Sequence, residues 1–221
     1  MIFSASPHRD AIRLLFILVE GSSSLLSSHP SGATLIFQGE TRLLAFEFWV
    51  RNPDYLAAEL LDRFEQTGEK ELLAEIDSIF AEDEPDIRRI PMIRYLRGAY
   101  EKLDDALSIL RSRDLVRIER KGKGVKIYET DFIIMPKAQE VAKKIVADFP
   151  DLSWYSRRAR LVAAIAGTDG GKALKARQYE RVQYAETRLG GIIPSIADET
   201  RERLKILKNE SVEGAEVAKY D

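Results

Sequence analysis

The sequence predicts a mainly α-helical protein with a small β-hairpin, an α+β fold of the winged-helix type. A helical pattern covers Tyr100–Arg113, with apolar residues recurring on one face. Two short strands, Leu115–Arg120 and Val125–Tyr128, flank the basic turn Lys121–Gly124. A closing helix then begins near Pro136 and runs to Asp148. This order of helix, hairpin and helix is typical of the second half of a winged helix. The apolar stripe of the first helix comprises Tyr100, Leu103, Leu107 and Leu110.

Helical patterns dominate the rest of the chain. We expect helices at His8–Glu20, Thr41–Asn52, Pro53–Gln66, Glu69–Ala81, Asp151–Ala166, Lys172–Leu189 and Ala197–Lys208. Short strands are expected within residues 33–39 and at Met92–Leu96. The pair Asn52-Pro53 separates two helices, because a residue before proline avoids the α region. The last dozen residues are polar, and we expect them to fray.

The length of 221 residues allows one large domain or two small ones, and 45% apolar residues allow a sizeable core. Residues 82–91, with the sequence EDEPDIRRIP, have the composition of a linker. We therefore expect an N-terminal helical region at 1–84, a winged-helix core at 85–149 and a C-terminal helical region with a frayed tail at 150–221.

Charge is distributed unevenly along the chain, although the formal net charge is only −2. Asp62 to Asp86 holds ten acids against two bases, and Arg111 to Lys126 holds seven bases against two acids. Such asymmetry indicates different partners for the two regions. The candidate residues for binding nucleic acid or a partner are Arg111, Arg113, Arg117, Arg120, Lys121, Lys123 and Lys126. The acids Glu101, Asp104 and Asp105 on the preceding helix oppose a phosphate-rich ligand there, so the charge favours the hairpin.

One stretch also resembles a known family. The run QGETRLLAFEFWVRNPDYLAAEL is similar to a pattern in the middle components of three-component ABC-ATPase systems. The matching residues are Gly39, Thr41, Arg42, Leu43, Glu47, Phe48, Arg51 and Pro53. Further on, Arg94, Tyr95 and Gly98 match, whereas Ala99 and Tyr100 replace the Pro-Trp of the family. The resemblance implies a non-enzymatic winged-helix subunit that bridges an ABC-like or SMC-like ATPase to another component.

Chemistry-bearing motifs are weak in this sequence. The two histidines, His8 and His29, have no second ligand at metal spacing, and there is no cysteine. The segment GTDGGKA at Gly167–Ala173 fails the phosphate-loop spacing and lacks the hydroxyl after its lysine. The acids of Glu82–Asp86 are consecutive rather than convergent. We therefore expect no enzyme activity, no metal and no cofactor.

The sequence leaves the partner open. A protein-bridging module of an ATPase assembly is the leading hypothesis, and a DNA-binding transcriptional regulator is the alternative. The amphipathic C-terminal helices could form a homodimer. The apolar run Ile12–Val19 is interrupted by Arg13 and is too short to span a bilayer, so we expect a cytoplasmic protein without membrane contact.

Overall fold

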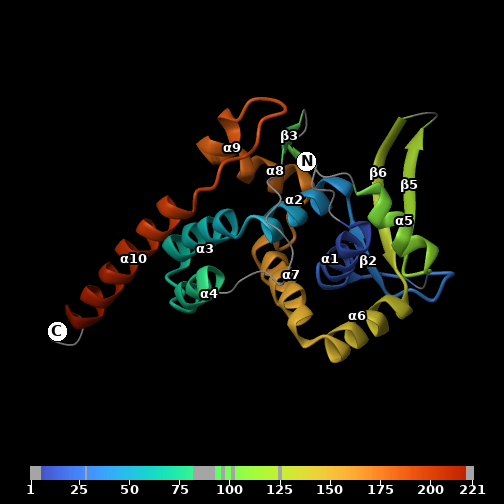
Figure 1. The fold of residues 1–221 in the computed structure, drawn as a ribbon, viewed down its shortest axis with the longest axis horizontal. Coiled ribbons are helices and arrows are strands. Elements are labelled where there is room, and N and C mark those ends of the chain that lie inside the picture. The colour runs from blue at the N-terminus through green and yellow to red at the C-terminus, as the bar shows by residue number, and fades with distance from the viewer. Residues whose placement is uncertain are drawn as a thin grey trace. The chain divides into compact units, whose positions relative to one another are not determined.

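The computed structural model describes residues 6–27, 29–81, 93–95, 98–100, 103–123 and 126–217; at 95, 100, 126 and 212–217 it describes the backbone alone. The chain forms two compact units (Figure 1). Unit 1 comprises Met1–Arg51 and Glu84–Ile193, and unit 2 comprises Asn52–Asp83 and Pro194–Asp221. The three consecutive regions expected from the sequence do not coincide with these units. The reason is that the first two helices pack with helices that follow residue 103, which sequence order does not reveal.

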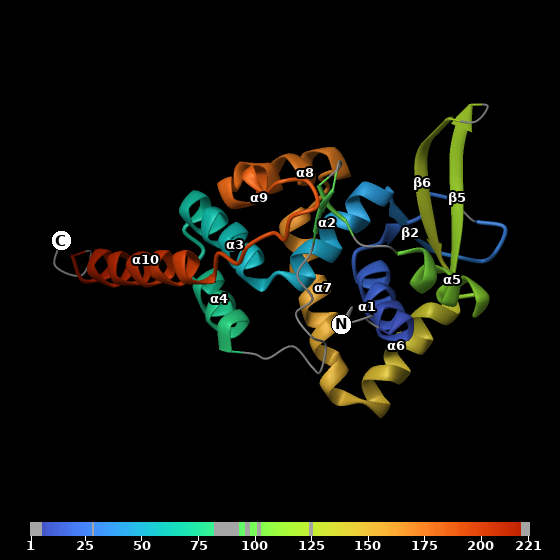
Figure 2. The ribbon, with the colours of Figure 1, turned by 45° about the horizontal axis from the view of Figure 1, so that its top comes forward.

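Unit 1 is built around α1 (Pro7–Glu20), which packs against α5, α6, α7 and the sheet. Figures 1 and 2 show α5 and α6 flanking it. The expected helix is present, and the whole run from Arg13 to Leu18 is buried. A helix that is apolar on nearly all sides belongs in the interior of a unit.

The sheet of unit 1 has four antiparallel strands in the order β1-β2-β6-β5. They are β1 (Ser23–Ser24), β2 (Leu35–Gln38), β5 (Val116–Lys123) and β6 (Lys126–Ile134). Side chains alternate between the faces, so Phe37 and Phe132 share one face and contact at 6.3 Å between ring centroids. Ile133 lies on the other face and packs with Ala33 and Met135. The α+β class and the antiparallel pairing of the two expected strands are therefore confirmed. Lys121–Lys123, expected in the turn, belong to β5 instead, and residues 124 and 125 lie outside the described residues.

The helix predicted for Tyr100–Arg113 is shorter in the structure. Helix α5 runs from Asp104 to Ser112, whereas β4 (Gly98–Tyr100) pairs with β3 (Ile93–Tyr95). The prediction was wrong at its start because distant partners hold this segment extended. The Ala99 N–H donates to the Tyr184 hydroxyl at 2.6 Å, and the Arg94 N–H donates to the Gly191 carbonyl. Of the expected apolar stripe, Leu103 and Leu110 are buried and Leu107 is partly buried, while Ala106, which was not assigned to it, is buried as well.

The remaining helices of unit 1 are α2 (Glu40–Arg51), α6 (Pro136–Asp148), η1 (Pro150–Leu152), α7 (Ser153–Ala166), α8 (Gly171–Glu180) and α9 (Val182–Glu186). Of these, α2, α6 and α7 pack against α1, whereas α8 packs against α2 and α9 against α8. The single helix expected for Lys172–Leu189 is divided at Arg181, whose ψ of 115° is extended rather than helical. Glycine and proline mark helix ends in a sequence, and Arg181 is neither. The break at Arg181 therefore has no signal in the sequence.

Unit 2 consists of α3 (Pro53–Thr67), α4 (Glu71–Ala81) and α10 (Ala197–Val217). Gly68 ends α3 in the left-handed conformation with φ of 71°, as expected for a C-terminal glycine. Arg203 on α10 forms ion pairs with Asp62 and Glu65 on α3, both at 2.7 Å. Helix α10 continues to Val217, so most of the tail expected to fray is helical; residues 218–221 and the predicted linker at 82–91 lie outside the described residues.

Candidate binding surface

The predicted basic residues lie on α5 and β5. Arg111 is in the last turn of α5, Arg113 follows that helix, and Arg117, Arg120, Lys121 and Lys123 belong to β5. All six side chains are exposed. Lys126 begins β6, and its side chain lies outside the described part of the chain. Four of the seven candidates therefore lie on β5, and two lie in the last turn of α5 or just after it.

Lys121 forms ion pairs within the hairpin. Its Nζ lies 2.9 Å from Glu129 Oε1 and 3.3 Å from Asp131 Oδ2. These hydrogen bonds raise the pKa of Lys121 and lower the pKa of Glu129. Burial raises the pKa of Asp131, whose side chain is only 2% exposed. The charge of Lys121 is therefore offset by two carboxylates that the returning strand supplies.

Two further side chains near the hairpin contact carboxylates. Arg117 NH2 lies 3.3 Å from Asp114 Oδ1, and His29 Nε2 lies 2.9 Å from Glu119 Oε1. His29 also contacts the Ser31 hydroxyl at 2.6 Å and lies in the loop between β1 and β2. The count of seven bases against two acids therefore overstated the positive charge. Glu129 and Asp131 follow the counted window, yet Glu129 lies opposite Lys121 and Asp131 pairs with it diagonally.

A hollow of about 540 Å³ separates α5 from β5. Its lining residues are Ser108, Arg111, Ser112, Asp114, Val116, Arg117 and Ile118. Arg111 and Arg117 thus approach one depression from different elements, together with two serine hydroxyls. Guanidinium and hydroxyl groups are the donors that commonly contact phosphate or carboxylate oxygens. The same depression contains the Asp114 carboxylate, which pairs with Arg117.

Ile127 and Tyr128 are functional candidates that the sequence reasoning missed. Their exposed fractions are 53% and 68%. The register shifts between Lys121 and Gly122, so Tyr128 is the additional residue of a β-bulge. Strand β2 pairs with Asp131–Ile134 only, so this distal part of β6 pairs with β5 alone. In a regular strand, consecutive residues point to opposite faces, so the apolar pair Ile127-Tyr128 cannot be buried on one face. This pair was the signal in the sequence for an exposed apolar side chain.

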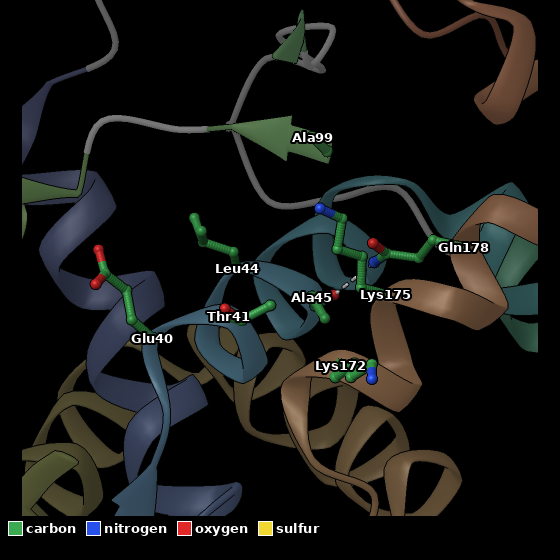
Figure 3. A pocket seen from close by; sticks show the side chains of 8 residues that line it. All are labelled: Glu40, Thr41, Leu44, Ala45, Ala99, Lys172, Lys175 and Gln178. Atoms are coloured by element: carbon green, nitrogen blue, oxygen red, sulfur yellow. Dashed lines mark hydrogen bonds between the residues drawn. The ribbon is translucent and has the colours of Figure 1, made fainter. Parts of the chain in front are cut away.

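A second depression lies between α2 and α8 and encloses about 360 Å³. It is lined by Glu40, Thr41, Leu44, Ala45, Ala99, Lys172, Lys175 and Gln178. Figure 3 shows that Lys172 and Lys175 extend in different directions and that Glu40 lies on the opposite side from them. Gln178 donates to the Ala45 carbonyl at 3.5 Å. These polar groups do not converge on one point as a catalytic or ligand-binding constellation would.

The residues that carry the family resemblance mainly fix α2. Arg42 lies over the Phe46 ring, 4.8 Å from its centroid, and donates to the carbonyls of Gly167 and Asp169. Partial burial lowers the pKa of Arg42. The loop at Gly167 follows α7 and precedes α8, which begins at Gly171. Arg42 therefore holds the loop between α7 and α8 through two hydrogen bonds, a contact that the sequence does not reveal.

Glu47, another matching residue, is fully buried and pairs with Arg13 of α1. Arg13 Nε donates to Glu47 Oε1 at 2.8 Å, and Arg51 lies 3.9 Å from the same oxygen. Arg51 lies within ion-pair distance of Glu47, but Arg13 is the nearer partner. Burial acts to lower the pKa of Arg13, and the attraction of Glu47 outweighs it, so that pKa is raised. These charges have a structural role inside unit 1.

Comparisons of the chain with family models, curated proteins and solved structures gave no match. Within the described ranges, no group of three or more histidine, aspartate or glutamate side chains is placed to hold a metal ion. Every helix among the described residues is too short or too polar to cross a lipid bilayer.

Proposed function

We propose that this chain is a non-enzymatic winged-helix module that binds a partner protein through the distal part of the β5–β6 hairpin. The strand order supports the winged-helix interpretation. In this order β2, which follows α1 in the chain, pairs with β6 of the hairpin that follows α5. The resemblance of the α2 region adds the expectation that the partner is an ABC-like or SMC-like ATPase.

The observation that carries this proposal is the exposure of Ile127 and Tyr128 on a part of the hairpin that no other strand covers. Exposed apolar side chains surrounded by charged ones mark interaction sites, and tyrosine is enriched at the energetic centres of protein interfaces. Lys123 and Arg120 lie nearby on β5 and suit an acidic surface around such a centre.

DNA binding is the second candidate, and the hollow between α5 and β5 favours it. Arg111 and Arg117 converge there with Ser108 and Ser112. The pairing of Lys121 with Glu129 and Asp131 weighs against it, because carboxylates beside the wing repel phosphates. A protein partner therefore accounts for both the exposed apolar residues and the balanced charge of the hairpin.

Titration of a random-sequence 24-base-pair duplex by fluorescence anisotropy separates the two functions. A DNA reader would bind at 50 mM salt, lose affinity steeply as salt rises, and lose it further in R111E/R117E. The proposed protein-binding module shows no more than weak binding, equal in R111E/R117E and the parent chain. Tight, salt-dependent binding abolished by R111E/R117E would replace the first proposal with the second.

Two further expectations accompany the proposal. The absence of cysteine suits a reducing cytosol, and we place the protein in the cytoplasm on that ground. A homodimer through the C-terminal helices stays a prediction, and sedimentation equilibrium would test it.

A further inference from the structure

Strand β5 lies at one end of the four-stranded sheet, and among the described strands only β6 pairs with it. The register decides which of its backbone groups face away from β6. The Met135 N–H donates to the Leu115 carbonyl at 3.0 Å, so these two residues form a hydrogen-bonded pair. Such pairs alternate along antiparallel strands, so Val116, Ile118 and Arg120 direct their N–H and C=O groups away from β6.

The pairing on the other side of β6 gives the same alternation. The Gly39 N–H donates to the Thr130 carbonyl at 3.1 Å, so Thr130, Phe132 and Ile134 direct their backbone groups toward β2. The β6 residues between them therefore bond to β5. The outer edge of β5 thus presents backbone donors and acceptors at strand spacing that no described strand satisfies. An open edge of this kind accepts the backbone of another extended chain.

The hollow between α5 and β5 borders the first half of this edge. Helix α5 packs beside β5 (Figures 1 and 2). The strand lines the hollow with Val116 and the half-buried Ile118, and the helix lines it with Ser108, Arg111 and Ser112. A chain that pairs with β5 therefore meets apolar side chains, a guanidinium group and two hydroxyls along one edge.

Charge decides which extended chain suits this edge. Strand β5 carries four bases and one acid, so the β5 strands of two copies would repel each other. Arg117 is partly offset by Asp114 at 3.3 Å. In the described part of the chain, no carboxylate pairs with Arg111, Arg120 or Lys123. An acidic segment of a different protein is therefore the complement of this edge.

We propose that β5 accepts an extended acidic segment of a partner protein as an additional strand, paired with the outward backbone groups of Val116, Ile118 and Arg120. Alternate side chains of a strand point to opposite faces, so a segment of alternating acidic and apolar residues offers both kinds of contact. This inference goes beyond the proposed function, because it depends on the edge of β5 and not on the exposure of Ile127 and Tyr128.

Fluorescence anisotropy with a labelled peptide of four Glu-Val repeats tests the proposal on the full chain. We expect saturable binding. A peptide of four Lys-Val repeats should bind at least tenfold more weakly, and so should the Glu-Val peptide with every internal amide N-methylated. The methylated peptide keeps the charge and the side chains but has no N–H to donate to the carbonyls of β5. Equal binding of the methylated peptide would show that charge alone attracts it, as it would attract nucleic acid, and would overturn the proposal.

Two variants test the edge from the side of the protein. Ile118→Pro removes an N–H that points away from β6, a position where edge strands tolerate proline, and it should weaken binding of the Glu-Val peptide at least tenfold. Arg111→Glu should weaken it at least fivefold. The matched control Lys144→Glu makes the same charge change at an exposed position of α6, outside the hollow, and should stay within twofold of the parent chain.

Circular dichroism of each variant verifies that the fold is retained. No binding of the Glu-Val peptide by the parent chain, unchanged binding in Ile118→Pro, or equal effects of Arg111→Glu and Lys144→Glu would each overturn the proposal. The synthetic peptides replace the native partner in this experiment, so its failure is distinct from a failure of the proposed function.

Discussion

Breaking the buried ion pair between Arg13 and Glu47 should destabilise unit 1 by several kilocalories per mole. The Arg13 side chain is 2% exposed and that of Glu47 is not exposed at all. The variant Arg13→Met keeps much of the side-chain length, so it adds little cavity. It leaves the Glu47 carboxylate buried, with Arg51 at 3.9 Å and without its closest donor. Removing one partner of a buried pair costs about 3–5 kcal/mol, and we expect a loss within that range.

Tryptophan fluorescence during urea unfolding measures the free energy of unfolding of unit 1. Both tryptophans, Trp49 and Trp154, belong to unit 1, so their emission reports the unfolding of that unit. The double variant R13M/E47L removes both charges together. It should be more stable than the summed losses of Arg13→Met and Glu47→Leu predict, with a coupling free energy of about 2–3 kcal/mol.

An exposed ion pair supplies the control. Arg117 and Asp114 are 51% and 63% exposed, and Arg117→Met should cost less than about 1 kcal/mol because solvent screens such pairs. A loss below about 1 kcal/mol for Arg13→Met, or strict additivity in the double variant, would refute the argument that Glu47 depends on Arg13.

Three further predictions follow from single contacts. Gly171→Ala should lower the free energy of unfolding by about 1–3 kcal/mol, because the added Cβ would lie 2.6 Å from the Arg42 backbone nitrogen. Gly170→Ala is the matched control, since its Cβ would have nothing within 4 Å. Equal urea midpoints for the two variants would contradict this prediction. Burial raises the pKa of Tyr184 to about 12. The protonated Tyr184 therefore makes its full contribution to the free energy of unfolding below pH 10. That free energy should fall by about 2–3 kcal/mol as the pH rises from 10 to 12, and the variant Tyr184→Phe should not show this fall. Asp54 accepts hydrogen bonds from Ser195 Oγ and the Ile196 N–H, both at 2.7 Å, so Asp54→Ala should speed amide exchange in the first turn of α10, and unchanged exchange would count against this cap.

Local chemistry was readable from the sequence where short-range rules apply. The break at Asn52-Pro53, the αL glycine at Gly68 and the strand-turn-strand order of the hairpin all depend on neighbours in sequence. The start of α5 was not readable, because the Tyr184 hydroxyl and the Gly191 carbonyl that hold β3 and β4 come from almost a hundred residues away. The division into two units depends on the same kind of distant packing.

The candidate surface was predicted in part for the same reason. Arg111, Arg113 and the bases of β5 were found by their spacing and charge. The carboxylates that offset Lys121 were not, because cross-strand register decides which residues face each other. Tyr128 became a candidate only when the bulge and its exposure were known. A charge count along the chain therefore identifies basic residues. It does not give the net charge of the surface on which they lie.

Site-specific photo-crosslinking at the hairpin tests the central claim most directly. A benzophenone amino acid replaces Tyr128 in one variant and Phe149 in the control, since Phe149 is a comparably exposed aromatic residue at 61%, next to α6 and outside the hairpin. Irradiation in the native cells is followed by identification of the products by mass spectrometry. We expect one protein product from position 128, an ATPase subunit, and none of it from position 149. The same products from both positions, or only nucleic acid at position 128, would contradict a hairpin that binds a partner protein.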